Sequence, residues 1–189
     1  ALMFSLIDGA LLPALPFPAG ERIVRVHRVE HATLSPEAFD YWLARQGSFE
    51  GLGAWVERTV NVTIEGERSE PVQGAALTAT ALPLLAVRPF LGRLFTEEDA
   101  GPGASAVVLV GHETWRTRLN GDPDVIGHTV RLNGEPAEII GVMPAEIRAL
   151  GYDPSLIVPL RYRRYRRGGV SGSLQYLHHH LLQPGHRAI

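Results

Sequence analysis

The clearest alternation of apolar and polar residues lies between Thr129 and Pro144. Val130 and Leu132 alternate with polar neighbours, which is typical of a strand with one buried face. Asn133 and Gly134 follow, and both residue types tolerate positive φ, so they predict a two-residue turn. A β-hairpin is therefore expected here. Its return strand carries the apolar residues Ala137, Ile139, Ile140 and Val142.

The return strand contains one irregularity. Ile139 and Ile140 are adjacent apolar residues, so the strand is either bulged or covered on both faces. Gly141 favours the bulge, because a glycine inside a strand often marks one. Pro144 ends the pairing, since proline has no amide hydrogen to donate.

Shorter patterns predict the remaining elements. Ser35, Pro36 and Gly47 are typical of the start and the end of a helix, between which Phe39 and Trp42 share one face. Strand, helix and strand at the start, followed by a turn-rich region, indicate a mixed α+β fold. The strands are expected at 22–29, 52–64, 71–78, 106–110, 156–160 and 174–182, and further helices at 81–86 and around Trp115 and Leu119.

The composition is that of a chain that buries a core. Its 189 residues are 45% hydrophobic and 20% charged, which suits one large domain or two small lobes. The 14 prolines and 20 glycines indicate many turns and short elements. There is no cysteine, so disulfides and thiolate chemistry are excluded.

The arginines are unevenly distributed. All 18 basic residues are arginine, and five of them lie between Arg161 and Arg167. The other 13 stand against 20 acidic residues, so nucleic acid is not an expected partner. The arginine run includes Tyr162 and Tyr165, and it suits contact with phosphate, RNA or anionic lipid as well as a solvated hinge.

The first 12 residues are mostly apolar. This run meets Asp8 early and Pro13 soon after, whereas a membrane span needs roughly 20 apolar residues. Three interpretations stay open: a buried core helix, the remnant of a signal sequence, or the last turns of a transmembrane helix.

Three groups of residues are candidates for chemistry. His178 and His180 would share one face of a strand, but a metal site needs three or four converging ligands. The acidic groups at 97–99 and 122–124 lack calcium-loop spacing, and helix starts and turns explain them. Residues 169–173 match half of a nucleophile elbow without its final glycine or its helix. No catalytic, cofactor-binding or metal-binding residue is assigned, and no cofactor is expected.

Several stretches, taken together and in order, resemble the periplasmic core domain of MacB-type ABC transporter permeases, including the acidobacterial type. Matches lie at 4–5 with 9–12, at 15–18, 21–24 and 39–42, at 87–95 (VRPFLGRLF), at 107–115 and at 182–185. The most specific part is GDP at 121–123, VIG at 125–127, LNG at 132–134 and IGVMP at 140–144. The motif residues expected to have structural roles are Gly92, Arg93, Phe95, Trp115, Gly121, Asp122, Pro123, Gly127, Asn133, Gly134, Gly141, Val142 and Pro144.

This resemblance implies a two-lobed α+β domain, in which a porter-like lobe carries an inserted, β-rich mixed lobe. Residues 1–18 would be the end of a transmembrane helix and its exit segment. Residues 19–69 and 172–189 would form the porter-like lobe, incomplete at its C-terminus, and 70–171 the inserted lobe with its arginine-rich linker. We therefore expect a fragment of a longer protein, in which the apolar face of residues 2–12 is poorly buried or engaged with another chain.

The resemblance also implies a function without chemistry in this domain. It would be the non-catalytic, periplasmic part of a permease of the bacterial inner membrane, transmitting conformational change and contacting partners during export or extraction of substrates. The implied partners are an ABC ATP-binding subunit or domain, which hydrolyses ATP, the remaining permease helices, a second copy of the chain and a periplasmic adaptor protein. Two other hypotheses stay open: a secreted hydrolase that uses Glu97, Asp99, His178 and His180, and a free-standing periplasmic binding module with a cleft between its lobes.

Overall fold

The computed structural model describes residues 23–24, 36–47, 49–64, 68–150, 153–161, 178–180 and 187–188, and all structural statements concern these residues. The helices are α1 (Pro36–Arg45), α2 (Ala81–Leu84), α3 (Glu97–Ala100) and α4 (His112–Arg118), with 3-10 helices η2 (Pro123–Val125) and η3 (Ala145–Leu150). The strands are β1 (Ile23–Val24), β2 (Gly53–Thr63), β3 (Glu70–Leu77), β4 (Leu91–Gly92), β5 (Val107–Val110), β6 (Thr129–Leu132), β7 (Glu135–Val142), β8 (Leu156–Pro159), β9 (His178–His180) and β10 (Arg187–Ala188).

Six of these strands form a sheet that closes on itself. The hydrogen-bonded order is β3-β8-β5-β7-β6-β2, and β2 pairs in turn with β3. The β2–β3 ladder is antiparallel and runs from Trp55 opposite Leu77 to Val62 opposite Glu70. At its far end β2 also pairs with β6, at Val62 and Thr63. This closure removes most free edges from the sheet, which protects its backbone groups from pairing with other chains.

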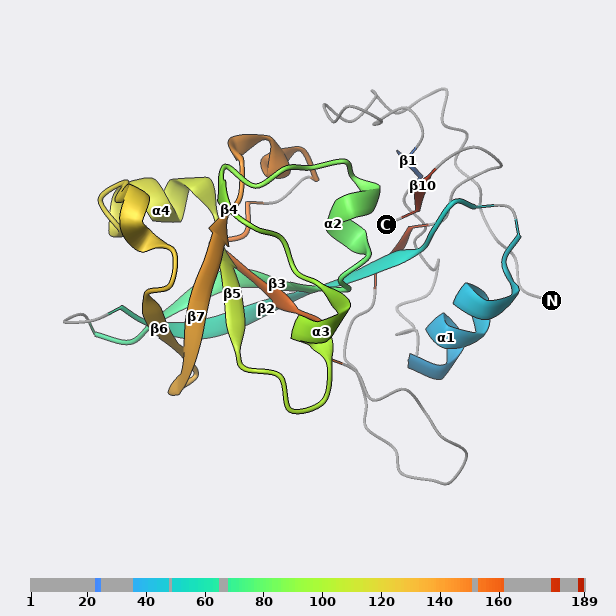
Figure 1. Ribbon diagram of the computed structural model, residues 1–189, viewed down its shortest axis with the longest axis horizontal. Helices are drawn as coiled ribbons and strands as arrows, with labels where there is room; N and C mark the ends of the chain where they lie inside the picture. The colour runs from blue at the N-terminus through green and yellow to red at the C-terminus, as the bar shows by residue number, and fades with distance from the viewer. Residues whose placement is uncertain are drawn as a thin grey trace.

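Four short strands of the described chain lie outside the ring. β9 pairs with the beginning of β2, at Gly53–Trp55, and β4 pairs with the end of β7. β1 and β10 form a separate parallel pair. β2 therefore takes part both in the closed sheet and in a ladder beyond it, and Figure 1 shows it extending from the sheet toward α1.

The two faces of the closed sheet bury separate clusters. In β5 all four residues are buried, Val108 and Val110 on one side and Val107 and Leu109 on the other. The interior cluster receives side chains from all six strands: Val60, Val62, Val72, Val108, Val110, Val130, Leu132, Ala137, Ile139, Val142 and Leu156. The outer cluster joins the opposite face to α2, to η3 and to the segment 87–95. A third cluster packs Phe39 of α1 against Leu52, Ala54 and Val56.

Most of the expected elements are confirmed. The hairpin is present with its two-residue turn, in which Asn133 has φ 52° and Gly134 has φ 90°, the geometry of a type I′ turn. The helix expected after Ser35 begins at Pro36, and the strand expected at 156–160 occupies Leu156–Pro159. The strands expected at 22–29 and 174–182 are described at Ile23–Val24 and His178–His180, and their other residues lie outside the description.

The irregularity in β7 combines both expected explanations. The register against β5 shifts between Val108 and Leu109, so Ile140 is an extra residue and the strand is bulged. Ile139 then belongs to the interior cluster and Ile140 to the outer cluster, and both are buried. The bulge lets two adjacent apolar residues serve two cores.

The α+β class is confirmed, since helices and a mixed sheet occur in one chain. The division into lobes at 19–69 with 172–189 and at 70–171 stays a prediction, and β2 of the first range pairs with β3 of the second. Residues 1–18 lie outside the description. Of the described helices, none has the length and apolar character required to cross a membrane.

Candidate functional site

Three motif residues, Gly92, Arg93 and Gly141, meet where β4 lies against the bulge of β7. The Arg93 amide donates to the Ile140 carbonyl oxygen (2.9 Å), and the Phe90 amide donates to that of Val142 (2.7 Å). A Cβ on Gly141 would lie 2.5 Å from the Arg93 carbonyl oxygen, and one on Gly92, whose φ is 72°, would collide with the Ile140 carbonyl oxygen. Both positions require glycine because two backbones touch there.

The side chain of Arg93 fixes the start of α3. Its guanidinium donates to both carboxylate oxygens of Asp99, at 2.6 and 3.0 Å. The same carboxylate accepts from the Thr96 amide (2.7 Å), and the Thr96 hydroxyl accepts from the Asp99 amide (3.4 Å), which makes a capping box. The helix start expected at 97–99 is therefore confirmed, and Phe95 beside it is buried in the outer cluster.

These contacts keep Asp99 ionised. The hydrogen bond from Arg93 lowers the pKa of Asp99 to about 2; partial burial opposes this effect and the bonds with Thr96 reinforce it. The same pairing raises the pKa of Arg93. An acid held in this form accepts hydrogen bonds and is poorly suited to donate a proton near neutral pH.

Trp115 and the Gly121-Asp122-Pro123 motif form a second support. The Trp115 indole donates to the Asp122 carbonyl oxygen (2.8 Å), while the Asp122 carboxylate caps η2 by accepting from the Asp124 amide (2.9 Å). Gly121 has φ 63°, and a Cβ there would lie 3.8 Å from the tryptophan ring. The motif thereby turns the chain from α4 toward β6.

Two more motif residues fasten β6 and β7. The Gly127 amide donates to the Ile139 carbonyl oxygen (2.8 Å). Asn133 exchanges two bonds with Asn61 of β2: its side-chain oxygen accepts from the Asn61 amide (3.0 Å), and its amide donates to the Asn61 carbonyl oxygen (2.7 Å). The hairpin turn thus helps to close the sheet, a role that the sequence alone does not reveal.

The last two motif residues follow the bulge. Val142 is fully buried in the interior cluster. Pro144 comes after the final pairing of β7, and its carbonyl oxygen accepts from the Ile147 amide (3.2 Å) at the start of η3.

Side chains around this packing motif form an exposed aromatic surface, which we call the aromatic corner: Phe90, His112, Trp115 and Ile126. The rings of Phe90 and Trp115 are 5.2 Å apart, as are those of Phe90 and His112. Phe90 is 52% exposed and Ile126 37% exposed. Sequence reasoning missed His112 and Ile126, because helical spacing and loop position do not reveal which side chains meet.

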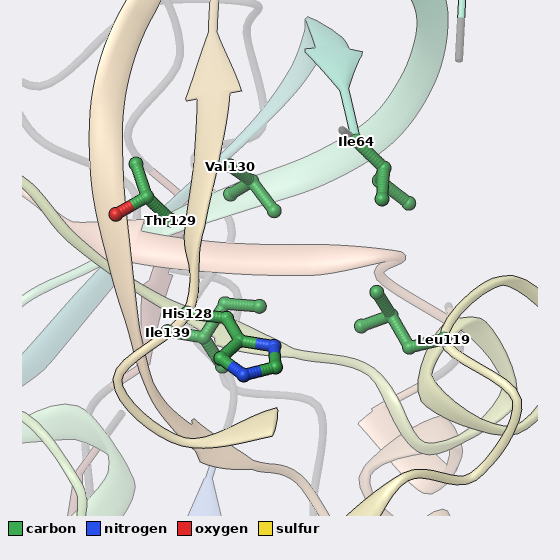
Figure 2. Close-up of a pocket in the computed structure, with 6 residues that line it drawn as sticks. All are labelled: Ile64, Leu119, His128, Thr129, Val130 and Ile139. Atoms are coloured by element: carbon green, nitrogen blue, oxygen red, sulfur yellow. The ribbon is translucent and has the colours of Figure 1, made fainter. Parts of the chain in front are cut away.

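A hollow of about 320 Å³ lies at the beginning of β6. Figure 2 shows Ile64, Leu119 and His128 around it, together with Thr129, Val130 and Ile139. Its walls are mainly aliphatic, and His128 is the titratable residue among those that line it. Among the described residues, this His128 hollow is lined by one imidazole and by no carboxylate.

The other candidate residues in the described chain lie on other elements. Glu97 and Asp99 lie on α3 and do not line this hollow. His178 and His180 lie on β9, and residues 169–173 are outside the description. Within the described ranges, no three histidine, aspartate or glutamate side chains come together as metal ligands would.

The family comparison identifies the class of protein: a periplasmic or extracellular domain of an ABC transporter permease. The family model of the MacB-like periplasmic core domain matches residues 1–178, so the chain belongs to that family. The resemblance seen in the sequence is thereby confirmed. No curated protein matches the chain.

Solved structures share the fold at low sequence identity. The periplasmic region of MacB from Actinobacillus actinomycetemcomitans has 17% identity and a TM-score of 0.52, over 72% of this chain and 63% of that one. The extracellular domain of the noncanonic ABC-type transporter YknZ from Gram-positive bacteria has 16% identity and a TM-score of 0.53, over 72% of each chain. A permease-protein domain from Porphyromonas gingivalis has 15% identity and a TM-score of 0.62, over 89% of this chain and 76% of that one. The match spans less than two thirds of the MacB region.

Proposed function

We propose that this domain is a non-catalytic coupler, which transmits conformational change through the permease and contacts its partners during export or extraction of substrates. ATP would be hydrolysed by a separate ATP-binding subunit or domain. The location would be the periplasmic side of a bacterial inner membrane. Family membership supports the setting, and the continuity of β2 is the observation that carries the mechanical role.

β2 is a single strand of 11 residues, about 35 Å long at the usual rise per residue. Its first residues pair with β9, its middle with β3, and its last residues with β6. A displacement at the β9 end would therefore pass into the closed sheet through hydrogen-bonded ladders, with no intervening loop to absorb it. Loops and element ends are where hinges normally form.

The aromatic corner supports the contact role. Aromatic side chains are enriched at protein interfaces, because they bury a large area with little loss of rotamer freedom. Phe90 is half exposed although its ring already contacts His112 and Trp115. We propose that it meets a partner of the assembly, among which the permease helices, a second copy and a periplasmic adaptor are the candidates.

Fluorescence measurements on the whole permease would test the coupling role. The chain has no cysteine, so Glu135→Cys can be labelled uniquely within it. In liposomes with the ATP-binding subunit, we expect the distance from this label to lipid dyes to change on ATP binding. The distance from Glu135→Cys to a second label at Arg88→Cys, also exposed on the same domain, should stay constant. An unchanged distance to the bilayer would contradict the coupling role.

A photo-crosslinking residue at position 90 would test the contact role in cells. We expect covalent products with another subunit of the transport complex, identified by mass spectrometry. A crosslinker at position 98, which is exposed on α3, is the matched control. Equal products from both positions would show that Phe90 has no special contact.

A further inference from the structure

A second hollow, of about 260 Å³, lies at the end of β6, and we call it the arginine mouth. Its walls are formed largely by Leu132, Val158 and Leu160, and two arginines, Arg58 and Arg161, also line it. The open ends of closed sheets are frequent ligand sites, because side chains from several strands converge there.

Arg58 is exposed, although it lies on the same face of β2 as two buried residues. It lies two residues from Val56 and from Val60, which are both buried, so all three point to the same face of β2. Its neighbour across the ladder is Gly74. A Cβ on Gly74 would lie 3.0 Å from the Leu156 side chain, a member of the interior cluster. Arg58 therefore extends from the core-facing side of the sheet.

The charge of Arg58 is not neutralised by any residue that the structure describes. Its side chain forms no hydrogen bond or ion pair with any residue in the part of the chain that the structure describes. Arg58 is exposed, so its guanidinium stays hydrated and can bind an anion from solvent without first leaving a partner among the described residues.

Arg161 presents a second charge that is held in place. Its guanidinium donates to the carbonyl oxygens of Ser105 (2.6 Å) and Asp99 (3.2 Å), and the Leu160 amide before it donates to the Leu77 carbonyl oxygen (2.6 Å). These acceptors are neutral, so they orient the guanidinium without neutralising it. The carboxylate of Asp99 is already bound by Arg93.

We propose that the arginine mouth binds a small anionic amphiphile. Its phosphate or carboxylate group would lie between Arg58 and Arg161, and its aliphatic part would pack on Leu132, Val158 and Leu160. Guanidinium groups suit this headgroup because they offer paired donors to its oxygens. The hollow has room for one headgroup and a short chain, and the aliphatic wall excludes a ligand that is charged throughout. This proposal is independent of the coupling role, and failure of either one leaves the other standing.

Titration of the full chain with octyl phosphate would test this site. We expect binding by calorimetry, with NMR shifts at the methyl groups of Val158 and Leu160. Arg58→Gln should weaken binding roughly tenfold or more, which is the usual loss for one charge-assisted hydrogen bond. Arg88→Gln, an exposed arginine that does not line the mouth, is the matched control and should bind as the parent chain does.

Two simpler ligands separate the contributions. Inorganic phosphate tests the headgroup alone and octanol the chain alone, and both should bind more weakly than octyl phosphate. Vesicles of anionic lipid would show whether a bilayer headgroup is captured in the same way as the free amphiphile. Equal binding of inorganic phosphate and octyl phosphate, or undiminished binding by Arg58→Gln, would overturn the proposal. Arg161→Gln gives an independent check, with its folding verified by circular dichroism.

Discussion

The contact between β4 and β7 and the arginine mouth differ in how their charges are paired and how tightly they are packed. At the β4–β7 contact, the charge of Arg93 is neutralised by Asp99, and glycines let two backbones touch. At the mouth, Arg58 has no partner in the described chain, and the glycine opposite it provides no side chain to fill the face. The first region is built for stability. The second presents two guanidinium groups with no acidic partner among the described residues, which is what a site for an anion would show.

The largest expected loss of stability comes from a substitution at the β4–β7 contact. Gly141→Val would place a side chain against the Arg93 carbonyl oxygen and against Leu109, 2.8 Å away. Because backbone cannot yield cheaply, we expect a loss of about 3 kcal/mol or more in unfolding free energy, measured by urea denaturation. Gly47→Ala is the control, since nothing lies within 4 Å of its Cβ. If Gly141→Val were as stable as the parent chain, the β4–β7 contact would not be tightly packed at this position.

The next effect concerns the turn that closes the sheet near the mouth. Asn133→Ala should lose about 2 kcal/mol, because alanine disfavours the positive φ and the Asn61 amide loses its acceptor. Asn133→Gly accepts the φ and should lose about half as much. Denaturation and hydrogen exchange at the Asn61 amide would measure both. Equal losses in the two variants would mean that the positive φ contributes nothing, and an unchanged stability of Asn133→Gly would mean that the side-chain bond contributes nothing.

A smaller, pH-dependent effect belongs to Asp99. Its pKa in the folded state is lowered to about 2, below the ordinary value of the unfolded chain. Its contribution is therefore complete above about pH 5 and is lost as the pH falls toward 2. We expect Asp99 to contribute about 1 kcal/mol to the unfolding free energy, because its partner Arg93 is half exposed and solvent screens the pair.

Asp99→Asn should reduce the acid-dependent fall in stability, as measured by denaturation from pH 6 to about pH 2. Glu98→Gln is the control, because Glu98 is an exposed acid on the same short helix. If the unfolding free energy of Asp99→Asn and of the parent chain fell equally with falling pH, the stabilising role of the ion pair would be contradicted.

The smallest expected effect has the opposite sign and lies at the mouth. Arg58→Leu should stabilise the fold by about 0.5 kcal/mol, because leucine can pack on Leu132 and Val158. Arg88→Leu, at an exposed position that does not line the mouth, should give no gain in thermal or urea denaturation. If Arg58→Leu lowers stability instead, Arg58 has a structural role and the contrast between the two regions fails.

Local features of the fold could be predicted because they depend on residues close in sequence. The hairpin follows from Asn133-Gly134 and alternation, the start of α1 from Pro36, and the bulge from Ile139, Ile140 and Gly141. The family motif was also visible, because its members are short runs in a fixed order. What each motif residue contacts could not be predicted, since the partners are distant in the chain.

The sequence by itself determined most of the longer elements, the glycine-dependent turns and the resemblance to a permease family. Only the tertiary structure decided that β2 closes the sheet with β6, that Phe90 meets His112 and Trp115, and that Arg58 shares a hollow with Arg161. The physical reason is the range of the interactions. Turns and caps are fixed by neighbours within a few residues, whereas closure and surface clusters depend on which strands pair across tens of residues.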